Sequence, residues 1–129
     1  MKTEIITQLY TKELLRQYPD KIFVFGDNMK RYGKGGQAII RDEPNAFGIA
    51  TKRYPSRDDW AYFSDKEDEL NFVLTDLRNL YKLGQEKVIC FPIAGIGTGL
   101  AQMKERSPLI FSRMNAILLE HFGFDNRNL

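Results

Sequence analysis

The chain alternates short apolar runs with amphipathic stretches, and this alternation predicts its secondary structure. Three apolar runs, at residues 21–26, 47–51 and 87–92, are bounded by turn-forming residues and predict buried strands. A weaker pattern predicts one more strand over residues 4–9. The strands are short and separated by longer segments, which leaves room for a helix between most neighbours.

Two long segments carry apolar residues at helical spacing. In the first, Ser64 and Glu67 predict a capping box, and Gly84 predicts a left-handed cap at the other end. The second is predicted to begin after Ser107 and to end at Gly123. Shorter helices are predicted at residues 11–18 and 35–41.

Strands that alternate with helices predict the α/β class. We expect one domain over residues 1–129, because this length and a hydrophobic content of 43% suffice for one core. The predicted architecture has three layers, α/β/α, with a mixed, largely parallel central sheet.

Composition narrows the kinds of partner. The 19 Lys and Arg against 17 Asp and Glu give a net charge of +2, too small for a protein that mainly neutralises a phosphate backbone, so nucleic acid would need a local basic patch. The only cysteine, Cys90, allows neither an internal disulfide nor a thiolate zinc site, and no metal or cofactor is expected. The charged N-terminus and the lack of a long apolar segment favour a cytoplasmic location with no membrane partner.

Two glycine-rich loops follow predicted strands. They are GDNMKRYGKGG at residues 26–36 and AGIGTG at residues 94–99. The carboxyl ends of parallel strands share one rim, where bare backbone N–H groups can hold a diphosphate. Each loop taken alone is better explained as a simple turn, and it is the pair of loops that favours a phosphate site. Neither loop matches a P-loop or a dinucleotide fingerprint, which disfavours a common ATP or NAD site.

The order and spacing of these segments resemble the macro domains, which bind ADP-ribose. VICFPIAGIGTGLAQ looks like their second phosphate loop, and VFGDNMKRYGKGGQAI looks like their first signature. FGIATKRYPSRDDWAYFSDKEDELNFVLTDL is similar to the strand, lysine, loop and helix of the branch that removes terminal ADP-ribose from carboxylate esters or DNA bases. The resemblance covers roughly residues 22–122 and implies a macro-like domain.

Position by position, the resemblance implies roles for the two loops. The second loop would surround the diphosphate, while the glycine pair of the first would close on the distal ribose, whose hydroxyls Asn28 would bind. Lys52 matches the lysine that attacks the anomeric carbon of the ribose in the hydrolase branch. The candidate ligand-binding residues are Asn28, Lys34, Gly35, Gly36, Gln37, Thr51, Trp60, Gly95, Ile96, Gly97, Thr98, Gly99 and Leu100.

The catalytic candidates are Lys52 and Asp27. Lys52 must lose its proton to act as a nucleophile, and Lys34 and Arg53 are the expected cationic neighbours that would lower its pKa; alternatively, it only pairs with phosphate. The hydrolase branch has a catalytic aspartate where this chain has Ala101. Asp27 is therefore the substitute acid or base, unless it only turns the chain by bonding nearby amides.

Aromatic residues between Arg53 and Asp65 have two interpretations. Trp60 and Tyr62 either stack on a ligand base or pack in the core, whereas Phe63 is expected in the core. His121 and Cys90 are expected to have no catalytic role.

Three functions remain open at this stage. The first is a mono-ADP-ribosyl glycohydrolase, and the second is a binding module or sponge for an ADP-ribose-derived or cyclic nucleotide signal. The third is a nucleic-acid-binding accessory protein. The ligand is expected to be ADP-ribose or a related nucleotide, free or attached to protein or nucleic acid, and the size suits a phage or bacterial accessory protein. The basic patch for nucleic acid would comprise Lys30, Arg31, Lys34, Arg41, Lys52, Arg53 and Arg57.

Overall fold

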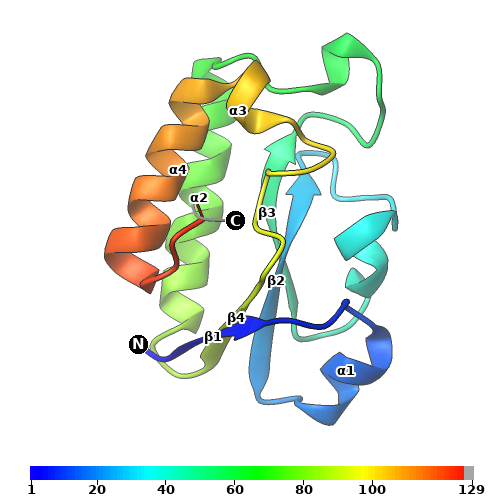
Figure 1. Ribbon diagram of the computed structural model, residues 1–129, viewed down its shortest axis with the longest axis vertical. Coiled ribbons are helices and arrows are strands. Elements are labelled where there is room, and N and C mark those ends of the chain that lie inside the picture. The colour runs from blue at the N-terminus through cyan, green and yellow to red at the C-terminus, as the bar shows by residue number, and fades with distance from the viewer. Residues whose placement is uncertain (127–129) are drawn as a thin grey trace.

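The computed structural model describes residues 1–126 of the chain (Figure 1). Its elements confirm the α/β class. In chain order they are β1 (Thr3–Ile6), α1 (Lys12–Gln17), β2 (Lys21–Asn28), the 3₁₀ helix η1 (Gly36–Ile40), β3 (Ala46–Lys52), the 3₁₀ turn η2 (Asp59–Ala61), α2 (Glu67–Leu83), β4 (Val88–Pro92), α3 (Met103–Arg106) and α4 (Pro108–Phe122).

The four strands form one sheet in the order β1-β4-β2-β3. Each strand pair in residues 1–126 is parallel, so the prediction of a mixed sheet was wrong. The one antiparallel contact in this part of the chain is an isolated bridge between Lys52 and Tyr62. β2 runs two residues further than expected because Asp27 and Asn28 continue the pairing with β3. A parallel arrangement gathers the carboxyl ends of all the strands at one edge.

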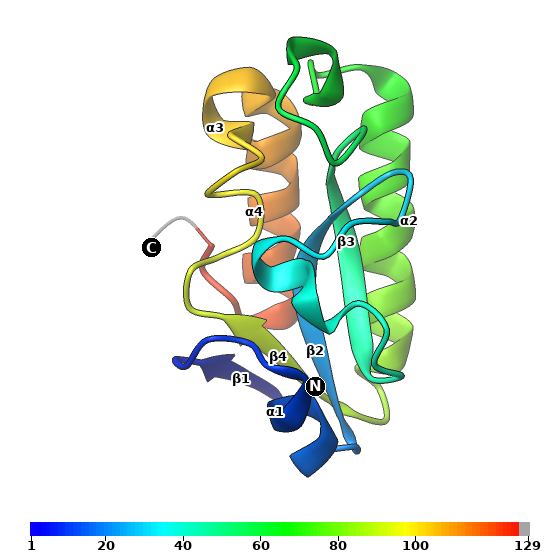
Figure 2. The ribbon, with the colours of Figure 1, turned by 90° about the vertical axis from the view of Figure 1, so that its right-hand side faces the viewer.

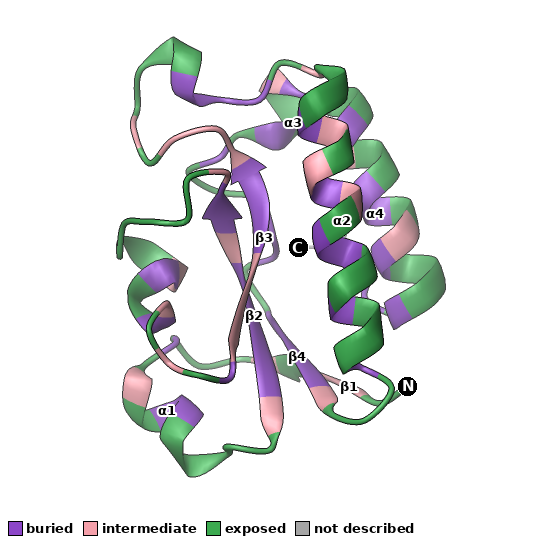
Figure 3. Ribbon diagram, turned by 180° about the vertical axis from the view of Figure 1, so that it is seen from behind, coloured by how far each residue is buried: buried purple, intermediate pink, exposed green. Residues whose placement is uncertain are grey.

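Helices lie on both sides of the sheet. Figures 1 and 2 show α2 and α4 side by side on one side, and α1 with η1 on the other. Two separate apolar clusters match this arrangement. The larger includes Val24, Phe91, Leu77 and Met114, and the smaller includes Phe25. In Figure 3 the helix surfaces that face the sheet are buried, while their outer surfaces are exposed.

The start of α2 differs from the prediction. The helix begins at Glu67, with Lys66 as its N-cap residue, and Glu69 Oε1 accepts hydrogen bonds from the backbone nitrogens of Lys66 (3.0 Å) and Ser64 (2.8 Å). The acidic partner is therefore Glu69 rather than the predicted Glu67. At the other end Gly84 has φ −67°, so the predicted left-handed cap is wrong. A Cβ there would lie 2.8 Å from the Met1 side chain, which gives this glycine a packing role instead.

The prediction for α4 is confirmed in position but not in capping. The helix lies between Ser107 and Gly123, and Gly123 is left-handed at φ 67°. The Ser107 hydroxyl donates back to the Met103 carbonyl (3.4 Å) instead of capping. The cap is Asp65, whose carboxylate accepts from the backbone nitrogens of Leu109 (3.2 Å) and Ile110 (2.9 Å) across 44 and 45 positions.

Polar side chains cover the outer edge of β3. Asp76 of α2 accepts a hydrogen bond from the Ala50 nitrogen (2.7 Å), and Arg31 donates to the Gly48 carbonyl (3.1 Å). Arg31 and Asp76 also form an ion pair. These contacts satisfy backbone groups that an edge strand leaves open, and they fix the loop after β2 against α2.

Candidate functional site

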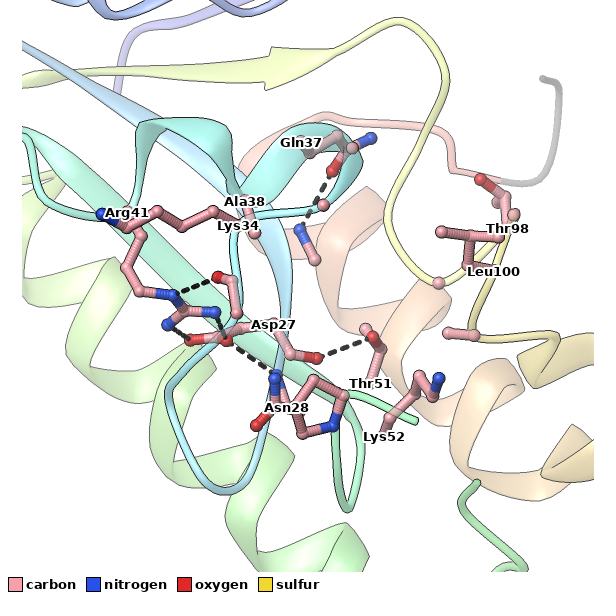
Figure 4. Close-up of a pocket in the computed structure, with 18 of the residues that line it drawn as sticks. Asp27, Asn28, Lys34, Gln37, Ala38, Arg41, Thr51, Lys52, Thr98 and Leu100 are labelled. Atoms are coloured by element: carbon pink, nitrogen blue, oxygen red, sulfur yellow. Dashed lines mark hydrogen bonds and ion pairs between the residues drawn. The ribbon is translucent and has the colours of Figure 1, made fainter. Parts of the chain in front are cut away.

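A pocket of about 580 Å³ lies at the carboxyl ends of β2, β3 and β4 (Figure 4). Its walls come from residues 26–41, 51–57 and 94–101. Of the sequence-predicted site residues, all except Ile96 and Trp60 line it. This volume falls within the range of roughly 300–1,000 Å³ that is usual for small-molecule sites.

The second glycine loop presents a run of free backbone donors. Within residues 1–126, the backbone N–H groups of residues 97–101 donate no hydrogen bond to the protein. Gly97, Thr98, Gly99, Leu100 and Ala101 all line the pocket. Consecutive free N–H groups make a concave site of positive potential, which suits a phosphate.

Two positions explain why this loop keeps its shape. Gly97 has φ 76°, and a Cβ there would lie 2.2 Å from Met103 Sδ, so both backbone and packing require glycine. The Thr98 hydroxyl donates to the Ala94 carbonyl (2.5 Å), which closes a hydrogen bond within the loop. Ile96 is fully buried beneath the loop, which explains why it does not line the pocket.

The first glycine loop is held by side chains that bind its carbonyls. Asn28 Nδ2 donates to the Tyr32 carbonyl (2.8 Å), and Asn28 Oδ1 accepts from the Lys30 nitrogen (2.9 Å). Arg41 Nε donates to the Gly33 carbonyl (2.7 Å). The side chain of Asn28 therefore organises the turn, and its predicted bond to a ribose stays untested.

Both carboxylate oxygens of Asp27 are engaged, as Figure 4 shows for its contact with Arg41. Asp27 Oδ1 accepts from Arg41 Nη2 (2.6 Å) and from the Asn28 nitrogen (2.8 Å); Oδ2 accepts from Arg41 Nη1 (3.1 Å) and Arg31 Nη1 (3.2 Å). This geometry favours the structural interpretation of Asp27 over a role as general acid or base.

Gln37 and Thr51 join the strand ends to one another. Gln37 Oε1 accepts from the Gly26 nitrogen (3.0 Å), while its Nε2 donates to the Gly95 carbonyl (3.0 Å). Thr51 Oγ1 donates to the Asp27 carbonyl (2.9 Å). Gln37 therefore links the two glycine loops directly.

Lys52 lies at the end of β3 and lines the pocket. Its ammonium donates to the Ser56 carbonyl (2.5 Å) and lies 4.5 Å from the centre of the Tyr62 ring. Burial lowers the pKa of Lys52 below its ordinary value, and Arg57 and Arg106 lower it further. The lowered pKa agrees with the hypothesis that Lys52 is a nucleophile. The cations that lower it are Arg57 and Arg106, however, and not the predicted Lys34 and Arg53.

The two predicted neighbours of Lys52 are paired elsewhere. Lys34 forms an ion pair with Asp42, and Arg53 bridges to Asp68 and to Glu69 at the start of α2. Such pairing removes much of the positive potential that each would supply to the pocket.

The predicted basic patch is weakened in the same way. Arg31 and Arg41 are paired with Asp27, in addition to the pairs of Lys34 and Arg53. Within residues 1–126, Lys30, Lys52 and Arg57 of this set form no salt bridge.

The aromatic residues between Arg53 and Asp65 differ in how deeply they are buried. Phe63 is in the core, as predicted, and Tyr62 is also buried, at 6% exposure. Trp60 is 60% exposed and meets Tyr54 edge to face at 4.8 Å, outside the pocket wall. Base stacking by Trp60 is therefore not supported within the pocket.

Several pocket residues were absent from the sequence-based site. Arg57, with Pro55 and Ser56, forms the wall beside Lys52, and Tyr32 and Arg41 form the wall near Asn28. Arg57 and Arg41 appeared only as members of the basic patch. The available signal was position in the chain. Pro55, Ser56 and Arg57 lie three to five residues beyond the end of β3, and Arg41 follows the glycine pair of the first loop.

Two other features support no further site. Burial raises the pKa of Cys90 to about 11, so the thiol is inert, as expected. Among residues 1–126, no group of three or more His, Cys, Asp or Glu side chains is arranged to hold a metal ion. No helix in that part of the chain is long and apolar enough to span a bilayer.

The fold and the pocket define an α/β protein with a glycine-lined pocket at the carboxyl ends of parallel strands. The chain belongs to a family of unknown function, DUF7831, whose model matches residues 5–117. This match includes both glycine loops, all of the predicted site residues and most of α4. No curated protein and no solved structure matches the chain.

Proposed function

We propose that this protein binds an ADP-ribose-type nucleotide, with the diphosphate on the free N–H groups of residues 97–101. That run of donors, on the wall of a pocket at the strand ends, is the observation that carries the proposal. The helices on both sides of the sheet agree with the three layers that the resemblance implies, whereas the parallel pairing of the described strands differs from the mixed sheet expected of a macro-like domain.

The charges around the pocket support an anionic ligand. Among residues 1–126, Asp27 is the only acidic residue in the pocket wall, and its charge is compensated by Arg31 and Arg41. Lys52 and Arg57 also line the wall and have no carboxylate partner among residues 1–126. An anion therefore meets donors and cations without an opposing free carboxylate.

The proposal extends to hydrolysis of an ADP-ribosyl linkage by Lys52. The neutral amine would attack the anomeric carbon, the bond to the leaving group would break, and the leaving group would take up the proton that the alkylated amine nitrogen loses. Water would then release ADP-ribose and restore the amine. The lowered pKa of Lys52 supports this role, because a larger fraction of the amine is neutral near pH 7.

A binding module without turnover is the second candidate. It is favoured by the engagement of both Asp27 oxygens and by Ala101 at the position where the resemblance expects an aspartate. Among residues 1–126, the wall offers no free carboxylate to move the proton that hydrolysis requires.

The first experiment is isothermal titration of ADP-ribose, with NAD, AMP and cyclic ADP-ribose as comparison ligands. The matched variants are Gly99→Glu and Gly99→Gln, since a Cβ added at Gly99 meets no atom within 4 Å. We expect Glu to abolish binding through charge repulsion and the isosteric Gln to weaken it less. Equal effects of Glu and Gln, or no binding to the parent protein, would contradict the diphosphate site.

Turnover is then tested with Lys52→Met on mono-ADP-ribosylated protein and DNA. Loss of cleavage with ADP-ribose binding retained would identify Lys52 as the nucleophile. Binding without cleavage by the parent protein would select the binding module.

A further inference from the structure

A buried amide network lies behind the second glycine loop. Asn126 Oδ1 accepts from the Ile96 nitrogen (2.9 Å), and Asn126 Nδ2 donates to the Ile96 carbonyl (2.9 Å) and to Asn115 Oδ1 (2.7 Å). The exposures of Asn126 and Asn115 are 1% and 3%, and none of the three residues lines the pocket. The paired bonds to Ile96 resemble those that a neighbouring strand would make.

The chain beyond α4 is shaped to bring Asn126 to this place. Gly123 reverses the chain at φ 67°, and the Phe124 nitrogen donates to the Leu118 carbonyl (3.0 Å). The Phe124 ring then stacks on Phe91 of β4 with the ring centres 4.4 Å apart. The segment that carries Asn126 is thus held by Phe124, which packs on β4, and Asn126 itself bonds to Asn115 of α4.

The backbone of Ile96 fixes which way the Asn126 amide faces, and Asn115 accepts its remaining N–H. If the oxygen and nitrogen of Asn126 were exchanged, its NH₂ group would face the Ile96 N–H and its oxygen would face the oxygens of Ile96 and Asn115. Only the observed orientation satisfies the buried groups.

This anchor sets the direction of the first free donor. In a planar trans peptide the carbonyl and the following N–H point in opposite directions. Because the Ile96 carbonyl points to Asn126, the Gly97 N–H points away from Asn126, and Gly97 forms part of the pocket wall.

We propose that Asn126, which also donates to Asn115, is a positioning residue that holds the second glycine loop with its N–H groups toward the pocket before a ligand arrives. A loop with three glycines in residues 95–99 has large conformational freedom, and an anchor that restricts it removes an entropy cost from binding. The effect on the ligand rests on the proposed function, whereas the effect on the loop does not.

The experiment compares Asn126→Ala with Leu14→Ala. The second variant is the control for lost stability, since Leu14 is buried in the smaller cluster, which contains no residue of the loop. Backbone ¹⁵N relaxation of the free proteins reports loop order, and isothermal titration with ADP-ribose reports affinity. Should Asn126→Ala not fold, Asn126→Ser tests the same bonds with a smaller loss of packing.

In Asn126→Ala we expect order parameters at Gly97, Thr98 and Gly99 to fall from about 0.85 to below about 0.6, with no such change in Leu14→Ala. ADP-ribose should bind about tenfold more weakly to Asn126→Ala alone, because the ligand must then order the loop. An unchanged loop, an equal loss in both variants, or a loosened loop with parental affinity would overturn the proposal. If the parent protein binds no ADP-ribose, the proposed function fails, and relaxation alone decides the role of Asn126.

Discussion

Replacing Gly97 by alanine tests whether the second glycine loop is as tightly constrained as its geometry indicates. At φ 76° an alanine is strained by about 1–2 kcal/mol. The new Cβ would also lie 2.2 Å from Met103 Sδ and 3.0 Å from Met103 Cγ, and Met103 is fully buried. Since methionine adapts its shape easily, we take the low end of the overpacking cost, about 1 kcal/mol.

The expected loss of stability is therefore about 2–3 kcal/mol. In urea unfolding followed by circular dichroism, this corresponds to a midpoint lowered by about 1–2 M with an unchanged slope. Gly99→Ala is the matched control in the same loop, because Gly99 has no positive φ and no atom within 4 Å of its added Cβ. The control should be neutral or slightly stabilising, by up to about 1 kcal/mol. Equal stability of the two variants would refute the reasoning.

Further outcomes are expected for three residues, Asp65, Lys52 and Cys90. Asp65→Ala should lower the stability by about 1 kcal/mol through loss of the α4 cap, whereas Asp65→Asn keeps the acceptor and should change the thermal midpoint little. Amine-directed labelling, followed by mass spectrometry, should modify Lys52 half-maximally at a lower pH than a lysine in a short peptide. Because its pKa is lowered in the folded state, Lys52 should also contribute stability that rises with pH toward the ordinary value of 10.5, a rise absent in Lys52→Met. Cys90 should resist thiol reagents at pH 8 until the protein is unfolded; rapid labelling of the native protein would contradict its burial.

The features that sequence predicted well are those that local chemistry decides. The helix preceding Gly123 was found because its apolar spacing and its terminal glycine lie within one segment. The strands were found because their apolar runs are continuous and end in turns. The short helix predicted over residues 11–18 is present as Lys12–Gln17, and Thr11 lies before it as the cap, accepting from the Leu14 nitrogen (3.1 Å).

What sequence missed depends on partners far apart in the chain. The pattern around Ser107 gave no reason to choose Asp65 as the cap, which lies more than forty positions earlier. Gln37 joins two loops across 58 positions, and no local pattern marks such a residue. The sequence alone does not show which arginines of the predicted basic patch are paired with a carboxylate, yet folding brings Asp27 to both Arg31 and Arg41.

The parallel order of the sheet also bears on how the chain is made in the cell. Of the four strands in residues 1–126, β1 leaves the ribosome before the others, but its one strand partner among them is β4, with Thr3 opposite Ile89. At about 5–20 residues per second, the interval between them is roughly 4–17 s. β2 and β3 can pair during that interval, because each is the other's neighbour and both are complete by Lys52. Of the four described strands, the one made earliest is thus among the last to be hydrogen-bonded, because its place in the sheet exists only after β4 has been made.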